Sequence, residues 1–85
     1  MTTRDDVFAV IKRHVVDTLE DLDESQISGD KSLKDLGANS LDIVEIVSGA
    51  MRELRVKVPR SELGKLEDVG GLVDLLYSVV SERDA

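Results

Sequence analysis

The stretch "DLGANSLDIVEIVS", from Asp35 to Ser48, carries the strongest signal about the fold of this chain. A glycine-containing turn ends in Asn39 and Ser40, and apolar residues then recur at intervals of three and four. This periodicity predicts an amphipathic helix from about Ser40 to Leu54. At about 100° per residue, its core face comprises the apolar residues Ile43, Ile46, Val47, Ala50 and Leu54.

The other side of this helix holds residues that its core face does not need. One line of them is mostly charged and consists of Asp42, Glu45, Gly49 and Arg52. Leu41 and Val44 lie beside the acids, outside the core face. An apolar pair flanked by charge on an exposed surface indicates a partner site. Single exposed apolar residues are also common, and the spacing alone favours that simpler interpretation.

Ser40 is at the N-terminal end of the predicted helix. Amide N–H groups and the helix dipole make such an end a natural seat for an anion, so a phosphate ester on this serine would fit. Serine and asparagine are also preferred N-caps, and capping is the commoner role of a serine at such a position. These residues by themselves leave both roles open.

Three further helices are predicted. In the first, the residues on one face are Phe8, Ile11, Val15, Leu19 and Leu22, with Thr2 or Thr3 as the cap. A long polar loop, "DLDESQISGDKSL", follows and is pinned by Ile27 and Leu33. After the central helix, "RVKVP" alternates polar and apolar residues. A short third helix from about Arg60 to Leu66 comes next. In the last helix, Asp68 is the cap, Leu72, Leu76 and Val79 or Val80 face inward, and Gly70 and Gly71 weaken the start.

Composition limits the class of protein. Eighty-five residues suit one small domain, here residues 1–85. With no cysteine, no tryptophan, one tyrosine and one phenylalanine, the core must be aliphatic and cannot rely on disulfides. We therefore expect an all-α fold: a small four-helix bundle with a short third helix and a long loop between the first two.

The formal net charge of −7 argues against binding to nucleic acid or to an anionic membrane, and suits basic protein partners. No apolar run approaches the roughly 18 residues of a membrane span. The beginning "MTTRDDVFAV" carries acids where a signal peptide would be basic. A cytoplasmic protein is expected.

The string "LGANSLDIVEIV" closely resembles the phosphopantetheine attachment motif of acyl carrier proteins, usually Gly-(Ala/Gly)-Asp-Ser-Leu followed by acids. The resemblance covers nearly the whole chain, including "SLKDLG", Pro59 and "VGGLVDLL". It implies that Ser40 carries 4′-phosphopantetheine, added from coenzyme A by a separate phosphopantetheinyl transferase. The thiol of that arm would hold an acyl group as a thioester, which explains thiol chemistry in a chain without cysteine.

The resemblance also implies roles for the surface and the core. Asp42 and Glu45 match the acids that dock on basic patches of partner enzymes, and Leu41 and Val44 match the apolar contacts beside them. Acyl chains in this family can enter between the second and third helices, which makes candidates of Val47, Ala50, Val58, Leu63 and Leu66. For any one of these five, core packing is the simpler explanation.

Two departures from the family pattern point to specialised partners. The acid usually found before the serine is Asn39 here, which lowers the charge near the phosphate and affects recognition by the transferase. The segment from Arg52 to Lys65 also has a local charge of +3, because two acids, Glu53 and Glu62, accompany the five bases Arg52, Arg55, Lys57, Arg60 and Lys65. Together the bases favour a partner that rejects ordinary acidic carriers, since like-charge repulsion confers specificity.

The combination of "GANSLD" and "RELRVKVPRSEL" resembles, more narrowly, the stand-alone donor carriers of polyketide β-branching cassettes. Such carriers receive malonyl from an acyltransferase, and a decarboxylating ketosynthase-like enzyme converts it to acetyl. An HMG-CoA-synthase-like enzyme then accepts the acetyl group and adds it to the β-ketone of a growing polyketide. On this interpretation the chain is a monomer that holds an intermediate and catalyses nothing, with partner contacts at Asn39 and at Arg52, Arg55, Lys57 and Arg60.

Other functions remain open at this point. The chain could be a general type II polyketide or fatty-acid carrier, although the basic segment fits the latter poorly. A peptidyl carrier more often reads Gly-Gly-(His/Asp)-Ser-Leu. A helical interaction module in which Ser40 is only a cap is an alternative of another class. An enzyme is disfavoured, because the single histidine, His14, belongs to no cluster and reads as a partly exposed helix residue.

Overall fold

The computed structural model describes residues 2–63 and 68–84, and every regular element in those ranges is helical. The elements are α1 (Arg4–Thr18), a 3₁₀ turn η1 (Glu24–Gln26), α2 (Ser40–Leu54), α3 (Arg60–Leu63) and α4 (Val69–Asp84). The all-α class is therefore confirmed. The third helix is described for one turn only. Residues 64–67, which include Leu66, lie outside the described residues, so the four-helix count stays a prediction.

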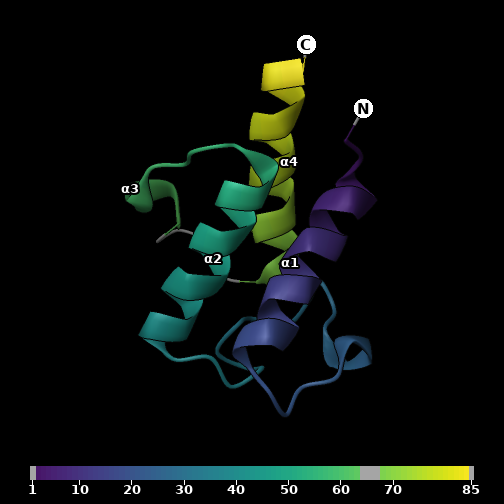
Figure 1. Ribbon diagram of the computed structural model, residues 1–85, viewed down its shortest axis with the longest axis vertical. Helices are drawn as coiled ribbons and strands as arrows, with labels where there is room; N and C mark the ends of the chain where they lie inside the picture. The colour runs from purple at the N-terminus through teal and green to yellow at the C-terminus, as the bar shows by residue number, and fades with distance from the viewer. Residues whose placement is uncertain (1, 64–67, 85) are drawn as a thin grey trace.

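Helix α1 lies against both α2 and α4 (Figure 1). It runs antiparallel to α2, and the loop that joins them crosses one end of the molecule, where α2 begins (Figure 1). The start of α1 and the end of α4 lie at the opposite end, close to where α2 finishes (Figure 1). Ser40, at the start of α2, is consequently at the other end of the bundle.

Helix α1 is capped by Thr3, which is one of the two threonines predicted for this role. The Thr3 hydroxyl accepts a hydrogen bond from the Asp6 N–H, and the Asp6 carboxylate accepts one from the Thr3 N–H. The helix ends at Thr18, so the prediction that Leu19 and Leu22 continue its face is wrong. Both leucines lie in the following loop, partly buried against the core. The fully buried residues of α1 are Val7, Ile11 and Val15.

The long loop is fastened to the start of α4. Ile27 is buried and Leu33 partly buried, as predicted. The Val69 N–H donates to the Lys31 carbonyl and the Gly70 N–H to the Gly29 carbonyl, each at 2.8 Å. A Cβ on Gly70 would lie 2.9 Å from that Gly29 oxygen. The glycine that weakens the helix start therefore permits the loop to approach.

The core is aliphatic, as composition predicts. Helix α2 contributes Ile46, Val47 and Ala50, with Ile43 and Leu54 partly buried. Helix α4 contributes Val69, Leu72, Val73, Leu76 and Val80. Asp68 accepts a hydrogen bond from the Gly71 N–H at 2.7 Å, which confirms its capping role. In the described ranges, no helix has the length and apolar character needed to cross a membrane.

The position of Gly49 among charged residues suggested that it lies on the free surface of α2. The structure does not place it there. It is half-buried and faces His14 of α1, whose ring would stand 2.6 Å from a Cβ at position 49. The missing side chain lets α1 and α2 come close together at this point.

Candidate functional site

Ser40 is the first residue of α2, and the residue that caps the helix is Asn39. The Asn39 side-chain oxygen accepts a hydrogen bond from the Asp42 N–H at 2.9 Å, and the Asp42 carboxylate accepts one from the Asn39 N–H at 3.2 Å. This pair forms a complete capping box. The alternative in which Ser40 is the helix cap is therefore wrong.

The Ser40 side chain is exposed and free to react. Within residues 2–63 and 68–84 its hydroxyl makes no hydrogen bond. In the same ranges, the N–H groups of Ser40 and Leu41 have no acceptor. The first N–H groups of a 15-residue helix carry partial positive charge. An exposed hydroxyl beside two free N–H groups fits a phosphate diester.

The predicted apolar pair is exposed beside the acids. Leu41 is 80% exposed and Val44 49%, and they are the two large hydrophobic side chains that stand out on the described surface. Glu45 is exposed as well, whereas Asp42 is half-buried because its carboxylate turns back to the capping box. The structure brings Ser40, Leu41, Val44 and Glu45 together on the first turns of α2.

The predicted basic residues lie at the other end of this helix. Arg52 is in its last turn, Arg55 is its C-cap, and Lys57 follows in the extended segment, all of them exposed. Val56 and Val58 are buried, which confirms the predicted alternation. Arg55 adopts the left-handed conformation with φ of 59°, as is common where a helix ends. Of Arg60 the structure describes the backbone alone.

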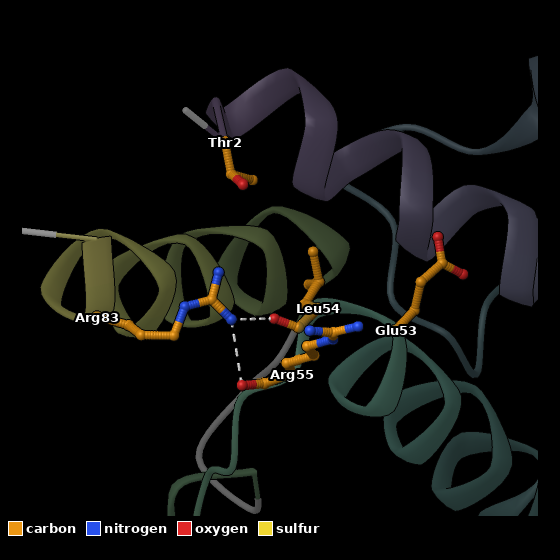
Figure 2. A pocket seen from close by; sticks show the side chains of 5 residues that line it. All are labelled: Thr2, Glu53, Leu54, Arg55 and Arg83. Carbon is orange, nitrogen blue, oxygen red and sulfur yellow. Dashed lines mark hydrogen bonds between the residues drawn. The ribbon is translucent and has the colours of Figure 1, made fainter.

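The candidate acyl-lining residues that the structure describes are part of the core. Val47, Ala50 and Val58 are all buried in the main hydrophobic cluster. Leu66 lies outside the described residues, and Leu63 is described by its backbone alone, so an acyl cleft stays a prediction. A shallow pocket lies at the C-terminal end of α2 and is lined by Thr2, Glu53, Leu54, Arg55 and Arg83 (Figure 2).

His14 has a structural environment. It is half-buried on α1, and its Nε2 lies 3.0 Å from Glu53 Oε1 on α2. Its interpretation as a partly exposed helix residue is confirmed, and its side-chain partner within the described residues is Glu53 and not Ser40. In the described ranges, no group of three or more His, Cys, Asp or Glu side chains could hold a metal ion.

Sequence reasoning missed one residue that contacts the C-terminal end of α2. Arg83 of α4 donates hydrogen bonds to the carbonyls of Leu54 and Arg55 (Figure 2). These carbonyls have no partner within their own helix. No local sequence pattern connects Arg83 to α2. The capping role of Asn39, in contrast, agrees with the known preference of asparagine for N-cap positions.

Comparisons with known proteins agree with this geometry. The family model described as "Phosphopantetheine attachment site" matches residues 9–76. The polyketide biosynthesis acyl-carrier-protein AcpK of Bacillus subtilis is 32% identical, over 87% of this chain and 90% of its own. An acyl carrier protein of Thermotoga maritima is 36% identical, over 89% and 94%.

A solved structure is similar as well. It is a chain of the curacin biosynthetic pathway HMG synthase in complex with acetyl donor-ACP, with a TM-score of 0.81 and 30% identity. The alignment covers 91% of the present chain and 99% of that chain.

Proposed function

The chain belongs to the phosphopantetheine-binding family of acyl carrier proteins, and we propose that Ser40 is the residue that carries its arm. Members of this family carry 4′-phosphopantetheine and are carriers rather than enzymes. The observation that supports Ser40 is its free, exposed hydroxyl beside a helix cap formed entirely by Asn39 and Asp42. The arm supplies a thiol that holds an acyl group as a thioester.

The surface around Ser40 suits enzymes that approach this arm. Leu41 and Val44 offer apolar contact, and Glu45 and Asp42 offer negative charge. A partner such as the phosphopantetheinyl transferase would place an apolar spot and basic side chains here. Since the contacts surround the attachment point, docking would bring the arm to the partner's active site.

The cargo and the receiving enzyme are a further part of the proposal. The chain takes malonyl from an acyltransferase, a decarboxylating ketosynthase-like enzyme turns it into acetyl, and an HMG-CoA-synthase-like enzyme accepts the acetyl group during polyketide β-branching. The similarity to AcpK and to a chain of the HMG synthase complex supports this role. The protein would work as a monomer in the cytoplasm, where these partners are expected.

A general type II polyketide or fatty-acid carrier is the second candidate. The 36% identity to the Thermotoga maritima acyl carrier protein supports it, because that value exceeds the identity to AcpK. The two candidates share Ser40 and its arm. They differ in the enzyme that accepts the acyl group.

The attachment is tested by incubating the protein with coenzyme A and a broad-specificity transferase, followed by intact-mass measurement. The wild type should gain the mass of one arm. Ser40→Ala should gain nothing, and Ser78→Ala, which alters an exposed serine of α4, should react as the wild type does. A gain that persists in Ser40→Ala would exclude Ser40 as the attachment site.

The donor role is tested with the holo-protein loaded with acetyl and an HMG-synthase-like enzyme encoded beside its gene. Transfer of acetyl to that enzyme should be fast, and an ordinary acidic carrier should replace the protein poorly. Equal transfer from both carriers would favour the general carrier instead. The genes adjacent to this one provide an independent check for a β-branching cassette.

A further inference from the structure

Three exposed cations at the C-terminal end of α2 have no acidic partner among residues 2–63 and 68–84. These residues, Arg52, Arg55 and Lys57, are called the basic end below. Within the described residues none of them forms an ion pair. Elsewhere in those residues Arg4, Lys12 and Arg13 pair with acids, whereas Lys31 and Lys34 of the long loop form no ion pair either. In a chain with 18 acids and 11 bases, unpaired cations gathered in one place are unexpected from composition.

The acid nearest in sequence does not neutralise the basic end. Glu53 lies next to Arg52, but its carboxylate is bound by Arg13 and His14 of α1. Figure 2 shows this side chain directed toward α1. The surface at the basic end is therefore more positive than the formal charge of the sequence segment suggests. That formal charge subtracts Glu53, whose carboxylate is bound by α1 in the fold.

The backbone that presents these cations is held in place. The Val56 N–H donates to the Met51 carbonyl at 3.0 Å and closes the left-handed turn at Arg55. Arg83 donates to the carbonyls of Leu54 and Arg55. Burial of Val56 and Val58 turns the Lys57 side chain between them outward. A surface fixed in this way loses less entropy when it binds a partner.

Charge changes sign along α2. Asp42 and Glu45 lie in its first half, and the basic end begins at Arg52. At 1.5 Å per residue, Ser40 and Arg55 are separated by roughly 22 Å along the helix. A partner that contacts both regions accepts α2 in one direction only, because the reversed direction would bring like charges together.

We propose that the basic end docks on an acidic patch of the HMG-CoA-synthase-like enzyme, and that Arg83 positions it. This inference rests on the proposed donor function and names a contact of that function which lies apart from Ser40. A protein surface is the favoured occupant, because three cations in a chain of net charge −7 do not attract a polyanion. For the same reason an anionic membrane is disfavoured.

The test measures kcat/KM for acetyl transfer from the loaded holo-protein to this enzyme. The variant Arg55→Asn/Lys57→Gln removes two positive charges, and asparagine tolerates the left-handed turn. We expect a roughly fivefold fall in kcat/KM at low salt, mainly through KM. The fall should shrink below about twofold at about 1 M salt, where the Debye length is about 3 Å.

A control variant changes the net charge equally at another place. Ser78→Glu/Ser81→Glu adds two negative charges at exposed positions of α4 and should transfer acetyl as the wild type does. Equal loss in both variants, or no loss in the first, would overturn the docking surface while leaving the donor function intact. A wild type that accepts the arm but transfers no acetyl would contradict the donor function and this contact together.

Polyanion binding is examined with the same variants. The wild type should not bind duplex DNA or vesicles of equal phosphatidylserine and phosphatidylcholine at physiological salt. Binding that disappears in Arg55→Asn/Lys57→Gln would replace the protein occupant with a polyanion.

The role of Arg83 is tested by a double-mutant cycle. Arg83→Gln should raise KM about twofold in the wild type and have no effect in the Arg55→Asn/Lys57→Gln background, because it acts through the basic end. Arg83→Lys should raise KM less than Arg83→Gln does, because lysine keeps a positive side chain that can donate to the carbonyls. An equal rise of KM in both backgrounds would contradict the positioning role and indicate a general loss of stability.

Discussion

The ring of His14 lies against the backbone of Gly49, so that a Cβ at position 49 would stand 2.6 Å from Nδ1 and 2.9 Å from Cε1. The same ring reaches Glu53 with its Nε2, one turn further along α2. His14 is therefore held between two residues of α2, and α1 can approach only because Gly49 has no side chain. This contact secures the helix that presents Ser40.

Gly49→Ala should destabilise the protein. Alanine gains about 1 kcal/mol in helix propensity, but overpacking costs about 1–3 kcal/mol. We expect a net loss of about 1 kcal/mol in the free energy of unfolding, measured with urea. In a His14→Ala background the clash is absent, and Gly49→Ala should stabilise instead. If Gly49→Ala already stabilises the protein with His14 present, the ring is not held as described.

Substitutions of Asn39 separate helix capping from charge. Asn39→Ala should lose about 1 kcal/mol of stability, because the Asp42 N–H loses its acceptor. Asn39→Asp should stay within about 0.5 kcal/mol of the wild type, since aspartate caps equally well. The transferase should then modify Asn39→Asp faster, because the family's acid is restored beside Ser40. A rate no different from the wild type would mean that the charge at this position has no part in recognition.

Leu41 and Ile46 are two large apolar residues of α2 that differ in burial, so their substitutions can be compared. Leu41 is 80% exposed and Ile46 is fully buried. Leu41→Ala should change stability by less than about 0.5 kcal/mol, whereas Ile46→Ala should cost about 2–5 kcal/mol. The opposite order is expected for partner contact, so Leu41→Ala should lower kcat/KM of the transferase without unfolding the protein. Modification of Leu41→Ala at the wild-type rate would refute its contact role.

The start of α1 should contribute a pH-dependent stability. The hydrogen bond from the Thr3 N–H lowers the pKa of the Asp6 carboxyl below its ordinary value of 3.8. A lowered pKa in the folded state means that the contribution is present above about pH 3.8 and is lost as the pH falls through the folded value. The stability difference between the wild type and Asp6→Asn should therefore shrink in acid. A difference that stays constant from about pH 6 to about pH 2 would contradict this coupling.

Local patterns predicted α2 well. The apolar spacing placed the helix at Ser40–Leu54, and the structure has the same bounds. The exposure of Leu41 and Val44 followed from their angle on that helix. Helix α1 was predicted less well, because Leu19 and Leu22 match the period of a helix but lie in the loop that follows. Periodicity marks apolar positions and does not distinguish a helical turn from a loop packed on the same core.

The sequence by itself determined the helical class, the limits of α2 and the place of Ser40 at its start, since each depends on neighbours within about one helical turn. Tertiary structure alone decided which charges neutralise one another. Glu53 meets His14 across 39 residues, and Arg83 reaches the Leu54 carbonyl across 29. Such pairs form only when the helices pack, and no local pattern contains them. The sequence marks Arg52, Arg55 and Lys57 as basic, and only the fold shows that the Glu53 carboxylate is bound by α1 instead of neutralising them.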